Sequence, residues 1–253
     1  MPDSTQRFSS RVETYLKYRP HYPSAVIETL VDRCQLLPAS IVADVGSGTG
    51  FLSELFLANN NLVYAVEPNR EMRLAGETYC QGYSNFRSVN GTAEATTLAE
   101  ESVDFVVAGQ AFHWFDPKQA RREFLRILKP GGWVALVWND LDTDPTPFLR
   151  PYEQLLQDYA TDYRQVTHKN IHESVFSDFF GEGNWSHQAF DYRQLFDYEG
   201  IKGRLMSSSY APQKEHPKHA PMLARLSSLF QTYSTDDLVS FKYKTRVFYG
   251  QLL

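Results

Sequence analysis

Cysteine is scarce in this chain, and long apolar runs are missing from it. Only Cys34 and Cys80 occur among 253 residues, too few for a disulfide framework, so we expect two buried side chains in a reducing, cytoplasmic setting. No stretch reaches the roughly 18 apolar residues of a membrane-spanning helix. The polar residues 1–19 lack the apolar core of a signal peptide. We therefore expect a soluble protein without membrane contact.

Positive charge is also in short supply. The chain has 25 Lys+Arg against 30 Asp+Glu, a net charge of -5, which provides no field to hold a nucleic-acid backbone. Apolar residues make up 42% and charged residues 22%, as in ordinary globular proteins. The length allows one domain with insertions, and we expect a monomer or homodimer that acts on a small molecule rather than on nucleic acid.

The seven histidines show no recognised metal-ligand spacing. His168 and His172 lie four residues apart and would share one face of a helix, but no third ligand accompanies them. We interpret them as a solvated pair and expect no metal.

Apolar periodicity alternates between strand and helix along the first half of the chain. A helix is predicted after Pro23, followed by strands at 41–45, 62–66, 86–89, 103–108 and 133–138 and helices at 51–57, 69–80 and 117–128. Several strand segments are too apolar to have a wet face, which favours a parallel sheet covered on both sides. Later segments predict helices at 148–163, 200–209 and 221–233 and strands at 185–192 and 238–249. The fold class is α/β and doubly wound.

This pattern suggests four segments. Residues 1–40 would form an amino-terminal lid and first helix, 41–138 a ligand-binding α/β core, 139–184 an inserted cap, and 185–253 the strands and helices that complete the sheet. The turn-rich stretch after Asn139 sets the third boundary.

A glycine-rich turn follows the first predicted strand, in the run Val42-Ala-Asp-Val-Gly-Ser-Gly-Thr-Gly50. Glycines there let a ligand approach the backbone. A dinucleotide site would need a third glycine where Phe51 stands, which disfavours an NAD-dependent oxidoreductase. The Asp-x-Gly-x-Gly-x-Gly run resembles the first motif of class I S-adenosylmethionine-dependent methyltransferases. The resemblance implies that Asp44, Gly46, Ser47 and Gly48 line the cofactor site.

Glu67 ends the second predicted strand, 21 residues after Gly46. A carboxylate at that position can accept two hydrogen bonds from a ribose diol, although a solvated glutamate is the alternative. The same resemblance assigns Pro68 and Met72 to the cofactor site. It also places Thr92, Ala93 and Glu94 beside the adenine, with Thr92 standing where the family often has Asp, so that the backbone at Ala93 becomes the expected contact.

The string Gln110-Ala-Phe-His-Trp-Phe-Asp116 follows the fourth strand. It resembles the methyltransferase type 11, or trans-aconitate methyltransferase-like, subgroup, which implies that Gln110 and Ala111 contact cofactor and that His113 and Trp114 contact substrate. His113 is also a candidate catalytic residue, or alternatively packs against the next helix. Phe112 or Trp114 can form an aromatic wall for the sulfonium by cation–π attraction, or can belong to the core.

Two outlying segments also resemble that subgroup. The amino-terminal segment implies a lid in which Tyr15, Tyr18 and Arg19 close over cofactor or substrate, Arg19 by pairing with a carboxylate. Arg19 is also a candidate catalytic residue. The segment around 204–212 implies substrate contacts from Ser207 and Tyr210, and Asn139 is added at the end of strand five. The resemblance further implies a Rossmann-like, mostly parallel seven-stranded sheet with an antiparallel last strand and a helical lid.

The predicted activity is methyl transfer from S-adenosyl-L-methionine to a small molecule. A carboxylate acceptor is ionised at neutral pH and requires no base, and no strong base stands out in the sequence, so O-methylation of a carboxylic acid is our leading hypothesis. Methylation of an N-, C- or other O-acceptor remains open. So does a cofactor-binding protein without turnover.

Overall fold

Seven strands form a single sheet in the computed structural model, which describes residues 16–142, 146–161, 163 and 173–252. The strands are β1 (Ile41–Val45), β2 (Leu62–Val66), β3 (Phe86–Val89), β4 (Val103–Gly109), β5 (Leu128–Leu141), β6 (Trp185–Phe196) and β7 (Val239–Gly250). Their order is β3-β2-β1-β4-β5-β7-β6. Neighbours from β3 to β5 pair in parallel, whereas β7 is antiparallel to both β5 and β6. The predicted Rossmann-like sheet with an antiparallel last strand is confirmed.

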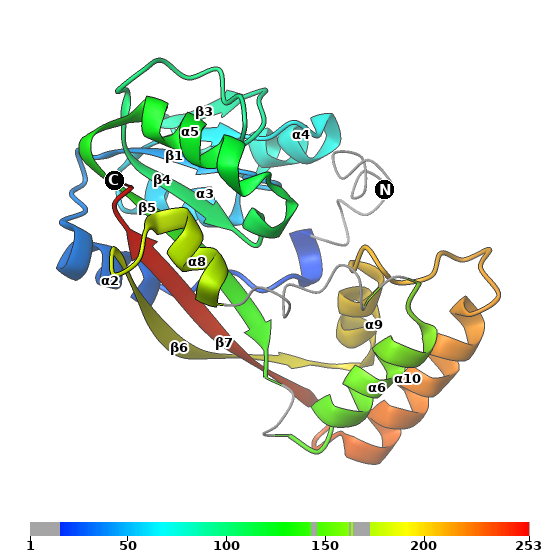
Figure 1. Cartoon of the computed structure of the whole chain (residues 1–253). Helices are drawn as coiled ribbons and strands as arrows, with labels where there is room; N and C mark the ends of the chain where they lie inside the picture. Colours follow the sequence, from blue (N-terminus) through cyan, green and yellow to red (C-terminus); the bar gives the residue numbers. More distant parts are fainter. Residues whose placement is uncertain (1–15, 143–145, 162, 164–172, 253) are drawn as a thin grey trace.

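Helices cover both faces of this sheet (Figure 1). One face packs α2 (Ala25–Cys34), α3 (Phe51–Ala58) and the end of α4 (Arg70–Tyr79) over residues such as Val42, Val63 and Val107. The other face packs α5 (Pro117–Ile127) and α8 (Glu173–Phe180) over residues such as Val45 and Val106. Central strands buried on both faces explain the continuous apolar runs of the sequence.

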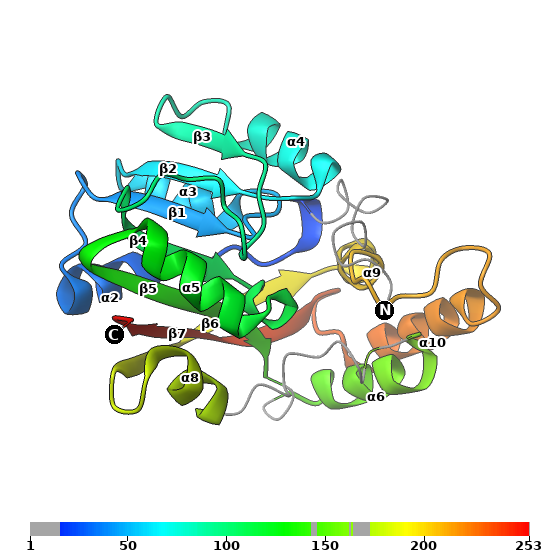
Figure 2. The ribbon, with the colours of Figure 1, turned by 45° about the horizontal axis from the view of Figure 1, so that its top comes forward.

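A third apolar cluster lies beyond the double-wound core. The ends of β6 and β7 pack against α6 (Leu149–Tyr159), α9 (Tyr198–Met206) and α10 (His219–Tyr233), with Phe241 and Tyr243 fully buried between them. In Figure 2 the arrowheads of β1 and β2 point toward the side of the molecule where α9 lies. The helical cap therefore stands at the carboxyl edge of the parallel strands, where open α/β sheets bind ligands.

Local signals fixed several element ends as expected. The Asn69 side chain caps α4 by accepting from the Met72 amide at 2.9 Å. The Asp116 carboxylate caps α5 by accepting from the amides of Lys118 and Gln119, with Pro117 in the first turn. These are the ordinary roles of Asn, Asp and Pro at helix starts.

Strand five is longer than predicted at both ends. It begins at Leu128, which pairs with Val103 before a register shift, and it continues to Leu141, which pairs with Tyr243. The sequence suggested a turn at 129–132 and a loop from Asp140, because Pro, Gly and Asp are typical of turns. Long-range pairing with β4 and β7 overrides those local preferences. Helix α8 lies in the segment that periodicity left unassigned.

The structure was also searched for membrane-spanning helices. Among the described residues, none of the helices combines the length and apolar character needed to cross a bilayer.

Phe112 belongs to the core, which decides between the two roles considered for it. The side chain is 2% exposed and packs edge-on against Phe115, Trp138 and Phe179. We predict that Phe112→Leu lowers the free energy of unfolding by about 1–2 kcal/mol, less than the 3–5 kcal/mol typical of truncation to alanine. Urea denaturation measures this loss. Unchanged affinity for S-adenosylhomocysteine is expected alongside it, and weakened affinity with unchanged stability would contradict the assignment to the core.

Candidate active site

The glycine turn is tied to the end of β2 by backbone hydrogen bonds. The amides of Gly46 and Ser47 both donate to the Val66 carbonyl, at 2.9 and 3.1 Å. Gly46 has a φ of +70°, and a Cβ added there would lie 2.7 Å from the Ala111 Cβ. Only glycine fits this position without strain. The turn is thereby locked against both neighbouring strand ends.

Glu67 lies directly across from this turn. One carboxylate oxygen accepts from the Gly48 amide at 2.9 Å, and the other accepts from the Asn69 amide at 2.8 Å. The side chain is 8% exposed, and burial raises its pKa against the opposing effect of these two amides and of Arg73. Each oxygen retains a lone pair for a further donor. Glu67 is thus a rigid acceptor pair, not a freely solvated glutamate.

Asp44 is fully buried at the end of β1. Its Oδ2 accepts from the Ser53 hydroxyl at 2.6 Å, while its Oδ1 has no hydrogen-bond partner among the described residues. Burial raises the pKa of Asp44 to about 7, a shift that the Ser53 hydrogen bond opposes and that nearby Glu67 reinforces. A buried oxygen without a donor is costly, which suits a ligand that brings one.

Two cavities open beside these residues. The nucleoside-side cavity, as we call it, is bordered by the ends of β2 and β4, the start of α4 and the turn after β3. It is lined by Gly46, Gly48, Glu67, Pro68, Asn69, Met72, Thr92, Ala93, Glu94, Gly109, Gln110, Ala111, Trp114 and Phe115. Ten of the predicted cofactor residues are therefore brought together here from four separate loops.

The second cavity, the cap-side cavity, lies between the glycine turn and the helical cap and has a volume of about 1270 Å³ out to its open mouth. Its walls come from the amino-terminal segment, α3, the ends of β4 and β5, and the cap. They comprise Arg19, Pro20, Tyr22, Asp44, Gly46, Ser47, Gly48, Thr49, Phe51, Leu52, Gly109, Gln110, His113, Trp114, Asn139, Leu141, Tyr152, Leu156, Tyr163, Arg204, Ser209 and Tyr210. The predicted substrate residues His113, Trp114, Asn139 and Tyr210 all line it.

The two cavities share one wall. Gly46, Gly48, Gly109, Gln110 and Trp114 line both of them. An elongated ligand can therefore lie with one end in each cavity, passing over the glycine turn. The shared wall is also where any chemistry between the two contents must take place.

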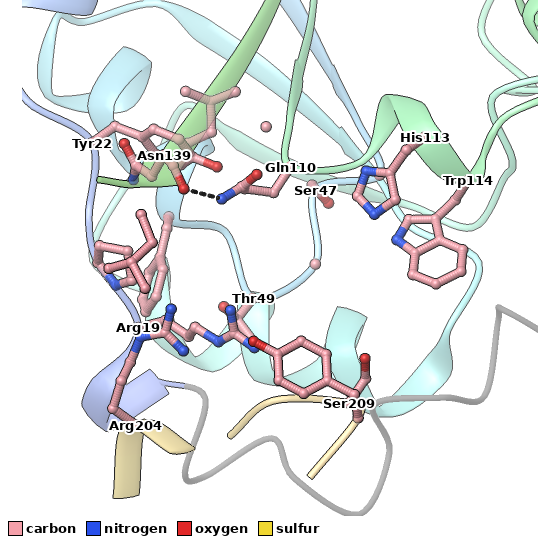
Figure 3. A pocket seen from close by; sticks show the side chains of 18 of the residues that line it. Arg19, Tyr22, Ser47, Thr49, Gln110, His113, Trp114, Asn139, Arg204 and Ser209 are labelled. Atoms are coloured by element: carbon pink, nitrogen blue, oxygen red, sulfur yellow. Dashed lines mark hydrogen bonds between the residues drawn. The ribbon is translucent and has the colours of Figure 1, made fainter. Parts of the chain in front are cut away.

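Gln110 is held in an unusual backbone conformation on this wall. Its φ is +55°, a value that residues other than glycine rarely adopt. Its side-chain amide donates to the Asn139 carbonyl at 3.0 Å (Figure 3). Asn139 is fixed in turn by the Thr245 hydroxyl at 2.6 Å. Strained backbone of this kind clusters at functional sites. The arrangement ties the end of β4 to the end of β5.

The predicted lid residues have different outcomes. Arg19 lines the cap-side cavity and donates to the Ser207 hydroxyl at 3.1 Å and to its carbonyl at 3.2 Å. Tyr18 lines neither cavity, because its ring packs against Gly203 of α9. Ser207 is fully buried beneath Arg19 and also lines neither. Tyr15 lies outside the described residues.

Several lining residues were not predicted. Thr49, Tyr22, Tyr152, Tyr163 and Arg204 all border the cap-side cavity. The sequence did contain a signal for Arg204. Arg204 is three residues after Ile201 and one before Leu205, both of which are fully buried. The spacing therefore places a charged side chain on or next to the apolar face of its helix. Tyr152 and Tyr163 come from residues 139–184, the predicted cap, in which the sequence showed no family motif besides Asn139.

Metal ligands were searched for as well. In the part of the chain that the structure describes, no group of three or more His, Cys, Asp or Glu side chains is placed to hold a metal ion. His168 and His172 fall outside that part.

Comparison with known proteins agrees with the geometry. Residues 43–136 match a family model described as a methyltransferase domain. An uncharacterized methyltransferase-like protein of Schizosaccharomyces pombe is 27% identical over 245 residues, covering 95% of this chain and 93% of the relative. An uncharacterized methyltransferase of Mycobacterium tuberculosis is 38% identical over 142 residues, which span 55% of each chain.

Solved structures show the same fold. A protein of Anaeromyxobacter dehalogenans, assigned as a type II methyltransferase, superposes with a TM-score of 0.69 at 21% identity, over 93% of this chain and 99% of that one. The matched domain contains the glycine turn, Glu67 and the shared wall, and the first relative extends the similarity to the cap. Residues 43–136 are therefore a methyltransferase domain, and the chain as a whole has the Rossmann-like methyltransferase fold.

Proposed function

We propose that this methyltransferase transfers the methyl group of S-adenosylmethionine to a carboxylate of a small organic acid. The observation that carries the proposal is the pair of cavities meeting at Gly46, Gly48 and Gln110. It supports a nucleoside held on one side of the glycine turn and an acceptor on the other. By the same proposal the protein works on small molecules in the cytoplasm, as a monomer or homodimer.

The nucleoside end is assigned to the first cavity. Glu67 offers one remaining lone pair on each carboxylate oxygen to the two ribose hydroxyls. Pro68 and Met72 border the site from β2 and α4, and Ala111 and Phe115 border it from the end of β4. Thr92, Ala93 and Glu94 close it where the adenine edge is expected.

The methionine end is assigned to the glycine turn and the neighbouring part of the cap-side cavity. Asp44 provides a buried carboxylate whose Oδ1 has no donor among the described residues, which suits an ammonium group. The Thr49 hydroxyl is buried beside it and is likewise without a partner in the described part of the chain. Arg19 brings a guanidinium to the same cavity, and its planar fork matches a carboxylate. The donor set therefore fits a zwitterionic amino acid.

S-Adenosylmethionine, when bound, supplies an electrophilic methyl group on a sulfonium. The chain then has to hold the acceptor in line with that group and exclude water. Trp114 lines both cavities and His113 the cap-side one, whereas Gln110 and Asn139 fix the strand ends that carry them. A carboxylate is already ionised near pH 7, so none of these residues has to remove a proton from it.

A related protein supports an acidic acceptor. The malonyl-[acyl-carrier protein] O-methyltransferase of a Marinomonas species is 29% identical over 135 residues, covering 51% of this chain and 49% of that protein. The acceptor named there is an acid.

His113 favours a second candidate. It lines the cap-side cavity, and a neutral imidazole can accept a proton from an alcohol or amine acceptor. Methylation at oxygen, nitrogen or carbon of a protonated acceptor would then replace ester formation. A cofactor-binding protein without turnover is the remaining alternative.

A labelling experiment separates these proposals. The protein is incubated with methyl-tritiated S-adenosylmethionine and matched sets of small acids, alcohols and amines, with Glu67→Gln as the inactive control. We expect label in a product that releases volatile methanol at alkaline pH, because only esters hydrolyse there. Base-stable product from an alcohol or amine would overturn the carboxylate proposal. Binding of S-adenosylhomocysteine without product from any acceptor would favour the protein without turnover.

A further inference from the structure

Arg204 is a buried cation in the wall of the cap-side cavity. It lies on α9, is 8% exposed, and donates through Nε to the Tyr243 hydroxyl at 3.2 Å and through one terminal nitrogen to the Ser208 hydroxyl at 3.3 Å. Both partners are neutral. Among the described residues no carboxylate forms an ion pair with it.

Burying a guanidinium without an anion is energetically expensive. The group carries five N–H donors in a fixed fork, and its two protein bonds leave about three for another partner. The phenol of Tyr243 is itself fully buried in the cap core, so Arg204 is held rigidly in place. A rigid buried cation whose donors are only partly used is suited to an anion from outside the chain.

A second guanidinium stands next to it. The Ser208 hydroxyl accepts from Arg204 at 3.3 Å and from Arg19 at 3.4 Å, so a single oxygen bridges the two cations. Figure 3 shows Arg19 and Arg204 on the same side of the cavity, with His113 and Trp114 on the other. Two like charges at this spacing repel each other. An anion between or beside them removes that repulsion.

The two arginines come from different parts of the fold. Arg19 belongs to the segment that continues through Tyr22, whose hydroxyl lies close to Gly109 on the shared wall. Arg204 belongs to the cap, as does Tyr152 of α6, and like Arg19 both line the cap-side cavity and not the nucleoside-side cavity. Arg19 is therefore placed to hold the methionine carboxylate, and Arg204 to face the remaining volume of the cap-side cavity.

We propose that Arg204 is the residue that selects an anionic methyl acceptor, by holding a carboxylate of that acceptor against the Tyr243 and Ser208 hydroxyls. The inference rests on the proposed function and names the residue that gives it substrate specificity. A neutral molecule of the same shape would leave the guanidinium buried and unpaired, and it is rejected for that reason.

Binding of defined acids tests the proposal. The probes are the dicarboxylates from malonate to adipate and their neutral diamides, titrated into protein saturated with S-adenosylhomocysteine and followed by calorimetry. We expect at least one dicarboxylate to bind about tenfold or more tightly than its diamide. Arg204→Gln should lower the affinity for that acid about tenfold and keep the affinity for S-adenosylhomocysteine within twofold of the wild-type value. Arg204→Lys, which keeps the charge without the fork, should restore part of the loss.

Matched controls separate specificity from folding. Arg225→Gln removes the same charge from an exposed position on α10 and should change nothing. Tyr243→Phe keeps the buried ring and removes the hydroxyl that accepts from Arg204. We expect this variant to bind the acid more weakly and S-adenosylhomocysteine with unchanged affinity. If Arg204→Gln does not fold, Arg204→Lys decides: weaker acid binding at unchanged cofactor affinity supports the proposal, and unchanged acid binding contradicts it.

Two further outcomes would overturn the inference. The first is that Arg204→Gln weakens the binding of S-adenosylhomocysteine and leaves the binding of the acids unchanged, because that result would assign Arg204 to the cofactor. The second is that the wild-type protein binds every diamide as tightly as the corresponding dicarboxylate. A wild-type protein that fails to bind S-adenosylhomocysteine at all would instead refute the proposed function, so the two failures are distinguishable.

Discussion

Glu67→Gln is expected to weaken binding of S-adenosylhomocysteine at least about 100-fold, equivalent to roughly 2.7 kcal/mol. Each oxygen of the carboxylate accepts one backbone amide, from Gly48 and from Asn69. A carboxamide has only one acceptor atom, so one of these amides would face an NH2 group. Either Gly48 in the glycine turn or Asn69 would lose its side-chain acceptor, and one ribose hydroxyl would lose its acceptor as well.

Calorimetric titration of the variant measures this loss. The thermal unfolding midpoint is recorded in parallel, because a buried amide without an acceptor also costs about 1–3 kcal/mol of stability, and titration is done well below that midpoint. Glu77→Gln is the matched control: this carboxylate on α4 accepts from the Ser88 hydroxyl in an exposed hydrogen bond and lines neither cavity. Affinity within threefold of wild type for Glu67→Gln would show that Glu67 does not hold the ribose.

The α/β core could be predicted from the sequence because its signals are local. A β-branched run marks β1, the glycine turn follows it directly, and Glu67 directly follows β2. The carboxyl ends of parallel strands meet at one edge of the sheet. Knowing the strands was therefore enough to bring Gly48 and Glu67 together. The mostly parallel seven-stranded sheet with an antiparallel last strand followed from the family resemblance, and the structure confirms it.

The cap could not be predicted in the same way. Helices α6, α9 and α10 pack on the protruding ends of β6 and β7. Periodicity predicted both strands, with β6 ending at 192 instead of 196, but it did not give their partners. The side of the cap that faces the glycine turn depends on this long-range packing. Arg204 and Tyr152 consequently went unrecognised, whereas Ser207, predicted from the family resemblance of its segment, is buried beneath Arg19.

In the amino-terminal lid, one cavity-lining residue could be predicted from the sequence and another prediction failed. Arg19 was chosen for its fork of donors, and it does line the cap-side cavity. Tyr18, one residue earlier, turns its ring toward Gly203 of α9 instead. Adjacent residues in a short segment point in different directions, and their sequence alone does not say which one faces the ligand.

Asp44 should make cofactor affinity depend on pH. Burial raises its pKa to about 7 in the ligand-free protein, and we propose that its Oδ1 accepts from the ligand's ammonium group. Below pH 7 the carboxyl must lose a proton before it can pair with that cation. Affinity for S-adenosylhomocysteine should therefore rise nearly tenfold per pH unit below 7 and level off above about pH 8.

Asp44→Asn should remove this dependence. The amide cannot ionise, so the affinity of the variant should be flat from pH 5.5 to 8 and about 30-fold weaker than wild type at pH 8, where a charge-assisted hydrogen bond is lost. 5′-Methylthioadenosine serves as the ligand control, because it lacks the amino-acid part and should bind the wild-type protein equally across this range. An equal pH dependence for both ligands, or for both proteins, would contradict the role of Asp44.

The same proton affects folding in the absence of ligand. The pKa of Asp44 is raised from 3.8 to about 7 in the folded protein, so between these values the folded state binds more protons than the unfolded chain. The free energy of unfolding should fall as pH rises through that window, relative to Asp44→Asn, and stay lower above it. Because nearby Glu67 contributes to the raised pKa, Glu67→Gln should shift the transition to lower pH. Denaturation of the three proteins from pH 4.5 to 8 tests whether one buried carboxyl governs both stability and cofactor affinity.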